Sequence, residues 1–450
     1  MNKTLVIFPN QLYTANKALS RQYDRIYIVE EPRYFSSPYK VNKIKLAYMV
    51  AAMHAHHTLL PKAQYVEHDH VEQLLHSLTS FDAWDPLDND LVAKYPKMRI
   101  LSTPLPNFML TPSDLEEYHR KHTTTFSHSS FFNFAKAKTN VLTDTHNLDS
   151  QNRQSIKQAP AHKDAPQRFN SKHYARAMSY INHHPRFQDH PGSTTHVGMY
   201  PITPAHAKQA LAAFITHRLH NFGPFEDAID KDNTILFHSF LSAAMNIGIL
   251  TPHDVIHAVL HATPKPPMNS VEGFIRQVLG WREYCGYLYK YRAKEIQVAN
   301  HWGNTSTLPA SWYTATTNIP PLNHEIQKAL TFGYSHHIIR LMVFLNLMTL
   351  HRIHPSDMMK WFMEVVSIDA YPWVMLTNIY MMSWTWTKAM KKPYISTSAY
   401  ILKMSNYPKG PWCTVWNELF YKFLHDKKDK FVGTSRIYLR HLNRQPSSAS

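Results

Sequence analysis

The N-terminal part of the chain alternates between short hydrophobic runs and longer helical patterns. The hydrophobic runs are Thr4–Phe8, Arg25–Val29 and Arg99–Leu101, and the helical stretches are Lys43–His54 and His70–Leu78. Such alternation predicts a parallel sheet with helices on its faces, which binds ligands at the carboxyl ends of its strands. No G-x-G-x-x-G fingerprint and no P-loop follows a strand, so the pattern does not support dinucleotide or nucleotide phosphate binding here. We therefore expect an α/β domain over residues 1–125.

The pattern becomes helical almost throughout from Pro201 onward. Apolar positions recur with the period of a helix, and prolines or short polar turns separate most of the stretches. The predicted helices are Pro204–His220, Ile235–Leu250, His253–His261, Val271–Tyr291, Leu322–Leu350, Pro355–Ser367 and Cys413–His425. The sequence therefore predicts a large all-α domain over residues 201–450.

Residues 126–200 form an interdomain connector in this interpretation. Thr111–Lys136 is expected to be helical, and residues 138–170 are polar and rich in Asn, Gln, Ser, Asp and Pro. The run KHYARAMSYINHHPRF that follows is basic and aromatic, a combination suited to phosphate contact. A solvated linker explains the same composition equally well.

The stretch Asn269–Tyr284 carries two distinct faces when it is read as a helix. Phe274, Val278 and Trp281 make an apolar stripe, whereas Glu272, Arg276 and Glu283 fall roughly opposite. Ionised groups need partners wherever they are buried. The pattern alone is equally compatible with an ordinary amphipathic helix that carries a solvated i,i+4 charge pair.

Composition points to a polyanionic partner. Lys and Arg number 48 and Asp and Glu 32, giving a net charge of +16 before the 31 histidines are counted. Such an excess favours nucleic acid first and an anionic membrane surface second, with an ordinary basic enzyme as the alternative. The two cysteines form no Cys-x-x-Cys pair, and no signal peptide or run of about 18 apolar residues occurs. We expect an intracellular protein, cytoplasmic or nuclear, without a membrane span.

Two further runs hold candidate chemistry. Ser239, Ser242 and Asn246 lie at i, i+3, i+7 and would share one side of a helix, where they suit either an anion site or simple helix capping. His336 and His337 precede a long apolar stretch. Adjacent histidines point about 100° apart on a helix, and no carboxylate lies at ligand spacing, so a metal site is not expected.

Several of these runs, in this order, resemble the cryptochrome/photolyase family. The carrying motifs are GFIRQ-x-x-GWREY, FGPFEDAIDKDNTILFHSFLSAAMNIGIL, YSHHIIRLMVFLNLM and IDAYPWVMLTN. They are most similar to the prokaryotic (6-4) photolyase-related branch, whose members often carry an iron–sulfur cluster. The resemblance covers residues 200–425, with weaker support at 1–136. It implies a photolyase-like fold with an antenna-type α/β domain and an all-α FAD-binding domain.

The resemblance assigns expected roles to residues of the helical domain. FAD would be held by Ser239, Ser242, Asn246, Gln277, Arg282, Arg340, Asp369 and Met375. Arg340 and Asp369 would pair beside the flavin, and Met375 would face its N5 atom. His337 would act in proton transfer to the lesion, next to His336, with Tyr394 in the lesion pocket. An electron relay would use Trp361, Trp312 and Tyr400, although core packing explains each of these aromatic residues as well.

Two features concern other prosthetic groups. A 6,7-dimethyl-8-ribityllumazine antenna, frequent in the branch, would lie near Asn10, Gln11, Leu12, Glu31 and Lys45. The positions of the cluster cysteines correspond to Pro321, Pro408, Pro411 and the vicinity of Cys413. One cysteine cannot hold a four-iron cluster, so we expect no cluster and no metal.

Three functions remain open on the sequence. The first is a monomeric lyase that uses reduced FAD and light to split pyrimidine dimers in UV-damaged DNA, most of all (6-4) photoproducts. The second is a cryptochrome-like blue-light photoreceptor without repair activity. The third is a nucleic-acid-binding protein that has lost its flavin, which the intact Ser239, Arg340 and Asp369 disfavour.

Overall fold

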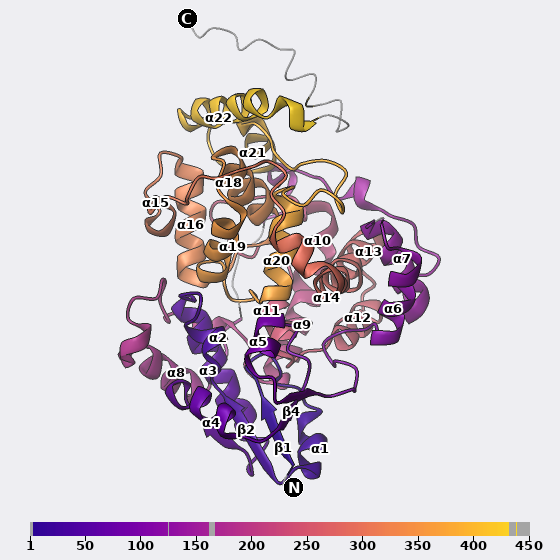
Figure 1. Cartoon of the computed structure of the whole chain (residues 1–450). Helices are drawn as coiled ribbons and strands as arrows, with labels where there is room; N and C mark the ends of the chain where they lie inside the picture. The colour runs from indigo at the N-terminus through magenta and orange to yellow at the C-terminus, as the bar shows by residue number, and fades with distance from the viewer. Residues whose placement is uncertain (1–2, 125, 162–166, 432–437, 439–450) are drawn as a thin grey trace, which may run out of the picture.

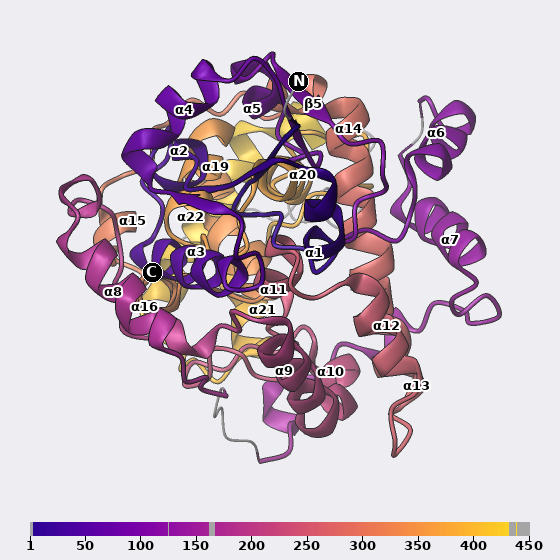
Figure 2. The ribbon, with the colours of Figure 1, turned by 90° about the horizontal axis from the view of Figure 1, so that it is seen from below.

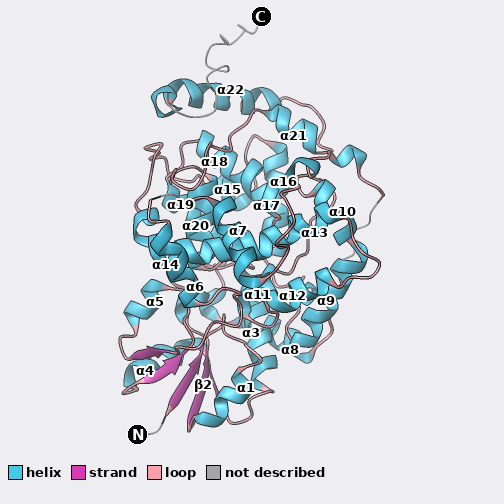
Figure 3. Cartoon of the chain, turned by 90° about the vertical axis from the view of Figure 1, so that its right-hand side faces the viewer, coloured by secondary structure: helices cyan, strands magenta, loops and turns pink. Residues whose placement is uncertain are grey.

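The N-terminal part forms a five-stranded parallel sheet in the order β3-β2-β1-β4-β5 (Figures 1 and 3). The computed structural model describes residues 3–124, 126–161, 167–431 and 438. The strands are β1 Thr4–Ile7, β2 Arg25–Val29, β3 Gln64–Val66, β4 Phe81–Ala83 and β5 Met98–Ile100. The three predicted strands are confirmed. The sequence did not reveal β3 and β4, because each is three residues long and includes a polar residue.

Short helices and one long helix connect the strands. They are α1 Asn16–Leu19, α2 Pro32–Phe35, α3 Lys43–His57, α4 Val71–Ser77 and α5 Asn89–Lys94. The predicted helices Lys43–His54 and His70–Leu78 correspond to α3 and α4. Almost all of α3 is buried, which explains its nearly continuous apolar pattern.

The connector contains more regular structure than its polar composition suggested. The expected helix Thr111–Lys136 is two helices, α6 Pro112–Lys121 and α7 His128–Thr139, because the Ser127 side chain caps the start of the second. The basic aromatic run forms α8 Lys172–His183, which packs on α3. Its buried Tyr174, Ala177 and Ile181 follow a helical period, a signal that the composition obscured.

The remainder of the described chain is helical (Figure 3). The helices before the middle of this part are α9 Pro204–His217, α10 Leu219–Phe225, α11 Ser242–Ile247, α12 Pro252–Leu260, α13 Met268–Ile275 and α14 Glu283–Gln297. The later ones are α15 Ser311–Thr314, α16 Pro320–Phe332, α17 His337–Ile339, α18 Asn346–Leu350, α19 Pro355–Glu364, α20 Pro372–Met382, α21 Ser398–Met404 and α22 Trp412–Asp426.

Three predicted helices are not continuous α-helices. Ile235–Leu250 contains only the six residues of α11, so the residues before Ser242 are not helical. Val271–Tyr291 is interrupted by a π-helical segment at Arg276–Arg282. Leu322–Leu350 ends at Gly333, whose φ of 61° terminates α16, and resumes through a second π-helical segment at Arg340–Leu345.

The sheet and the helices share one continuous hydrophobic core. Asn42 links the two parts at their boundary. Its side-chain oxygen caps α3 by accepting from Ile44 N at 3.1 Å, and its amide donates to Leu330 O at 3.1 Å and Val365 O at 3.3 Å. One side chain therefore provides hydrogen-bond partners for a backbone N–H group at the beginning of α3 and for backbone carbonyl groups at the ends of α16 and α19. The boundaries 1–125, 126–200 and 201–450 remain a prediction.

Candidate functional site

A cavity of about 1330 Å³ lies among the helices. Its walls come from the α10–α11 connection, both π-helical segments, the Asp369 turn, α20 and the loop 387–396. Each π-helical segment is a widened turn, a feature that often occurs at functional sites. Phe274, Val278 and Trp281 line this cavity together with Arg276 and Arg282, so both predicted faces of the helix contribute to one wall.

The charged residues of this helix are buried and paired, in contrast to the solvated-pair interpretation. Glu283 accepts hydrogen bonds from the backbone N–H groups of Met109 at 2.8 Å and Leu110 at 3.3 Å. Arg276 Nη1 lies 3.0 Å from Asp149 and its Nε lies 3.5 Å from Glu272. These contacts fix the rotation of the helix about its axis, and thereby the side that it presents to the cavity.

Arg340 and Asp369 also line the cavity and contact each other there. Arg340 Nη2 lies 3.0 Å from both carboxylate oxygens of Asp369, and its Nε donates to Ser335 O at 2.6 Å. The Ser242 hydroxyl donates to Asp369 Oδ2 at 2.7 Å, and the Asn246 amide donates to Asp369 O at 2.8 Å. The structure therefore brings together four of the residues that the family resemblance singled out.

Arg282 extends this network and leaves part of its guanidinium free. Its Nη2 donates to Asn246 Oδ1 at 3.2 Å, and the guanidinium lies 4.5 Å from the ring centroid of Phe108 and 4.9 Å from that of Trp373. Burial lowers its pKa to about 10, so it stays cationic near neutral pH. Within the described chain its Nε and Nη1 are buried without a hydrogen-bond partner. A buried cation with unsatisfied donors suits an anionic ligand.

Three histidines line the cavity near Arg340. His336 stacks on His238 with ring centroids 4.3 Å apart, and His337 approaches Trp281 edge-on at 6.1 Å. The side chain of His337 is exposed to the cavity, where desolvation by the surrounding walls first and Arg340 second lower its pKa to about 4. Burial lowers the pKa of His336 well below its usual range. Both imidazoles are therefore neutral near pH 7.

The remaining predicted pocket residues also line the cavity. Ser239, Gln277, Met375, Tyr394 and Tyr400 all contribute to its walls. Ser239 does so from the irregular segment before α11, so it does not share a helix face with Ser242 and Asn246 as we expected. Ser242 and Asn246 do lie on the short helix α11.

Two of the three predicted relay residues, Trp361 and Trp312, do not line the cavity, whereas Tyr400 does. Phe362 lines the cavity, whereas Trp361 packs behind it with ring centroids 5.2 Å apart. Trp361 donates from Nε1 to Trp312 O at 3.0 Å, and the two indoles lie 5.7 Å apart. Trp361 and Trp312 are thus neighbours, and Phe362 separates them from the cavity.

Sequence reasoning missed several polar groups of the cavity. Burial raises the pKa of Glu226 to about 8 and that of Asp227 to about 6, and both line the cavity near Arg276. Asn378 accepts from Trp281 Nε1 at 2.7 Å and donates to Cys285 Sγ at 3.2 Å. The sequence signal that could have revealed these groups is a charged or amide residue within an otherwise apolar helical pattern. Asn378 was missed because its helix, α20, was not among the predicted helices.

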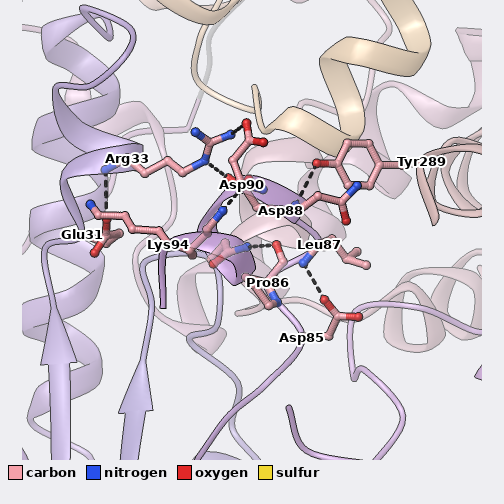
Figure 4. Close-up of polar contacts among 12 residues, drawn as sticks. Glu31, Arg33, Asp85, Pro86, Leu87, Asp88, Asp90, Lys94 and Tyr289 are labelled. Carbon is pink, nitrogen blue, oxygen red and sulfur yellow. Dashed lines mark hydrogen bonds and ion pairs between the residues drawn. The ribbon is translucent and has the colours of Figure 1, made fainter. Parts of the chain in front are cut away.

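Three of the five predicted antenna residues, Asn10, Gln11 and Glu31, follow strands of the sheet and make internal contacts, and Figure 4 shows Glu31 near Arg33 and Lys94. Asn10 and Gln11 donate to Pro86 O at 3.1 Å and Trp84 O at 2.8 Å. Glu31 accepts from Lys94 at 2.8 Å and from the Tyr95 hydroxyl at 2.8 Å.

Neighbouring groups at this edge are also paired. Arg33 bridges to Asp88 at 2.5 Å and Asp90 at 2.6 Å.

Leu12 and Lys45 face the helical part of the protein instead. Leu12 N donates to Ile247 O at 2.8 Å. Lys45 donates to Ala370 O and lies 4.2 Å above the Tyr371 ring, and burial lowers its pKa to about 7. None of the five antenna candidates lines the large cavity.

The positions that correspond to cluster cysteines lie at helix beginnings. Pro321 is in the first turn of α16, Pro411 immediately precedes α22, and Cys413 is buried in the first turn of α22. Across residues 3–124, 126–161 and 167–431, no group of three or more His, Cys, Asp or Glu residues could hold a metal ion. No helix in the described part is both long and apolar enough to cross a membrane.

Comparisons with known sequences agree with this geometry. Residues 5–198 match the family described as deoxyribodipyrimidine photo-lyase-related protein. The (6-4) photolyase of Agrobacterium fabrum is 35% identical over 265 residues, which cover 56% of this chain and 52% of that protein. The chain thus spans about half the length of this relative. Two uncharacterised proteins of Acanthamoeba polyphaga mimivirus are 45% and 40% identical over 86% and 87% of their lengths, and over 23% and 25% of this chain.

Solved structures share the fold along the whole chain. A class III photolyase from Agrobacterium tumefaciens has a TM-score of 0.59 at 16% identity, covering 100% of this chain and 93% of its own. A Synechocystis cryptochrome has a TM-score of 0.58 at 12% identity, covering 98% of this chain and 88% of its own. Residues 5–198 therefore match the photolyase-related family, the chain is similar in part to a (6-4) photolyase, and its overall fold is that of photolyases and cryptochromes.

Proposed function

We propose that this protein binds FAD in the large cavity and uses light to split pyrimidine dimers in UV-damaged DNA. The single observation that carries the proposal is the cavity wall itself. The paired Arg340 and Asp369 border about 1330 Å³ of space, which is also lined by Arg282, whose buried Nε and Nη1 have no hydrogen-bond partner. That space exceeds the 300–1,000 Å³ or so of a drug-sized site, as a dinucleotide and a flipped base together require.

The residues that line the cavity suit FAD. Arg282 would hold an anionic part of the cofactor, and Ser239 and Ser242 would add hydroxyl contacts from the wall between α10 and α11. Arg340, fixed by Asp369 and Ser335, would keep a positive charge beside the ring system. Reduced FAD, when bound, supplies the electron that light makes available to the lesion.

The histidines would handle the proton of the reaction. His337 lines the cavity next to Trp281, and Tyr394 lines the same space. The neutral state of His337 in the free protein makes it a proton acceptor at first. A bound phosphate or an anionic lesion would raise its pKa, because an opposite charge favours the protonated imidazole.

DNA would approach over the loop 387–396. Lys388, Lys391 and Lys392 contribute to the cavity rim from this loop, and Arg153 does so from the connector. Phosphate contacts by such residues would position a strand, while flipping a damaged base into the cavity costs less than flipping a paired one. The chain's net charge of +16 supports a polyanionic partner.

We infer the (6-4) photoproduct as the preferred lesion from His336 and His337, and this is the finer part of the proposal. A photoreceptor without repair activity would use the same flavin cavity. The alternative has one point in its favour: both histidines are neutral in the free protein near pH 7, so neither is a ready proton donor.

A repair assay tests the proposal. Protein reconstituted with FAD and reduced by dithionite would be illuminated with blue light in the presence of an oligonucleotide that contains one (6-4) photoproduct, one cyclobutane dimer, or no damage. We expect light-dependent restoration of the (6-4) oligonucleotide, none in the dark, and loss in His337→Ala. Equal flavin content without repair of either lesion would favour the photoreceptor.

Further properties belong to the same proposal. We infer that the protein is a monomer. We also infer that it resides inside the cell, a location that its two unpaired cysteines support. We also infer that it holds no iron–sulfur cluster, since prolines lie at Pro321, Pro408 and Pro411. A ribityllumazine antenna near Asn10, Gln11 and Glu31 would require their internal hydrogen bonds to open.

A further inference from the structure

A ladder of aromatic rings runs from the cavity along the π-helical segment and α14. Trp281 and Tyr284 have ring centroids 6.4 Å apart, Tyr284 and Tyr287 6.3 Å, and Tyr287 and Tyr291 5.3 Å. Every step is close to contact between side chains. The four residues therefore form an unbroken row of oxidisable rings.

The row connects the cavity with the outer side of the molecule. Trp281 lines the cavity, Tyr284 and Tyr287 are fully buried, and Tyr291 is half-buried. The helices α6 and α7 lie beyond α14 on that side (Figures 1 and 2). Aromatic packing alone would explain such a row, so the decisive question is whether any member can release a proton.

One hydroxyl of the row has a proton acceptor. The Tyr287 hydroxyl lies 3.2 Å from Nδ1 of His119 on α6. Burial and the charge of Arg292 lower the pKa of His119, so near pH 7 this imidazole is neutral and can accept a hydrogen bond at Nδ1. Within the described residues, the buried hydroxyls of Tyr284 and Tyr291 have no hydrogen-bond partner. Loss of the proton is therefore easiest at Tyr287.

The expected relay through Trp361 lacks this direct access. Phe362, whose ring is hard to oxidise, stands between Trp361 and the cavity. Trp281 is itself part of the cavity wall. A path that begins at Trp281 thus avoids the phenylalanine that separates the other path from the cavity.

We propose that Trp281, Tyr284 and Tyr287 form a second electron-transfer path, which ends in a tyrosyl radical at Tyr287 with His119 as its proton acceptor. The inference rests on the proposed function, because the path leads to the cavity assigned to FAD. Trp281 gives one electron to photo-excited, oxidised FAD and regains it from Tyr287 across the ring of Tyr284. The phenolic proton of Tyr287 passes to His119 Nδ1. An external thiolate then returns one electron by way of Tyr291, and His119 returns the proton to Tyr287. Over two such cycles two thiolates become one disulfide, and FAD gains two electrons together with one proton from solvent.

The experiment detects the radical directly. FAD-loaded, oxidised Trp361→Phe protein would be flashed with blue light, and the products followed by transient absorption and freeze-quench electron paramagnetic resonance. We expect a tyrosyl radical that Tyr287→Phe reduces at least tenfold and that His119→Gln forms more slowly. Tyr289→Phe is the matched control, because Tyr289 lies on the same helix, accepts from Asn89 N at 3.2 Å and is outside the row. It should leave the radical unchanged.

The possible failures are distinguishable. A protein that cannot be loaded with FAD overturns both the proposed function and this path. A loaded protein that forms no tyrosyl radical, or whose radical survives Tyr287→Phe, overturns the path alone. Circular dichroism and flavin content of each variant identify any substitution that fails to fold, and Tyr284→Phe, which keeps a bridging ring, should retain the radical where Tyr284→Leu loses it.

Discussion

Arg340 Nη2 lies 3.0 Å from each carboxylate oxygen of Asp369, and both side chains are almost fully buried. The two residues come from segments that are not ordinary helices. Arg340 begins the π-helical segment Arg340–Leu345, and Asp369 lies in the turn between α19 and α20. This contact closes one wall of the cavity, and it leaves Asp369 with Ser242 and Asn246 as further partners.

Removing the carboxylate should destabilise the protein strongly. Asp369→Ala leaves a buried guanidinium without its counter-charge, which typically costs about 3–5 kcal/mol. The exposed pair Arg352 and Asp426 provides the control, since Asp426→Ala should cost less than about 1 kcal/mol. Urea denaturation of the two variants measures both effects. Equal, small losses would show that the Arg340–Asp369 contact does not form in solution.

Arg282 should destabilise the fold of the FAD-free protein and strengthen the binding of FAD. Arg282→Met removes a buried cation that has unsatisfied donors, so the apoprotein should be at least as stable as the parent. Charge-assisted hydrogen bonds contribute about 1.5–3 kcal/mol each, so FAD affinity should fall roughly 10- to 100-fold. Arg292→Met on the same helix, whose guanidinium donates to Thr123 O at 2.6 Å, should leave FAD affinity unchanged. Calorimetric titration with FAD checks this, and an unaffected affinity in Arg282→Met would contradict it.

Acid should weaken the fold through His56. Burial first and His57 second lower its pKa from 6.5 to about 4, and its Nε2 lies 3.2 Å from the Asn16 amide nitrogen. The unfolded chain therefore binds a proton that the folded protein excludes, and stability falls as pH drops from about 6.5 to about 4. Between pH 7 and 5 the loss from this group should be about 2 kcal/mol. His56→Gln, which keeps an acceptor, should lose correspondingly less in urea titrations at the two pH values.

Much of the site was predictable because its chemistry lies in short, continuous motifs. Arg340, Asp369 and Asn246 were singled out from such runs, and the structure joins them in one network. Features that depend on local backbone geometry were not predictable. Neither π-helical segment disturbs the apolar period enough to be seen in sequence, and Ser239 was placed on a helix that begins only at Ser242.

Contacts between segments that are far apart in the sequence were not predictable either. Lys45 looked like a residue of the sheet's ligand edge, yet its ammonium reaches Ala370 in the helical part. The strands β3 and β4 were not predicted because their formation depends on pairing with neighbouring strands rather than on the pattern of their own three residues. Phe362 at the cavity wall, one residue beyond the predicted Trp361, likewise depends on how α19 packs.

Gly286 should not tolerate a side chain. A Cβ atom at this position would lie 2.7 Å from Cε1 of Phe108, the ring that stacks on Arg282. Gly286→Ala should therefore cost about 1–3 kcal/mol, as overpacking usually does, and should weaken FAD binding by shifting Arg282. Gly303→Ala is an unsuitable comparison because of its φ of 62°, whereas Gly198→Ala meets only Phe169 O at 3.4 Å and serves as the control. Thermal unfolding and FAD titration measure the two effects.

The loop 387–396 should carry part of the salt dependence of DNA binding. Lys391 and Lys392 are exposed at the rim of the cavity. Each phosphate contact contributes about −0.7 to −0.9 to the slope of log K against log salt, so Lys391→Ala with Lys392→Ala should reduce the magnitude of that slope by about 1.4 to 1.8. The exposed pair Lys422 and Lys428 on and after α22 provides a double-alanine control with the same change in charge. Equal slopes in both double variants would place the DNA elsewhere.

The absorption spectrum of protein incubated with FAD and freed of excess ligand tests the central claim most directly. We predict one FAD per chain, with a resolved flavin absorption band that Arg282→Met or Asp369→Ala diminishes and Arg292→Met leaves intact. A folded protein that retains no flavin after gel filtration, at concentrations where the family fold is intact by circular dichroism, would contradict the account.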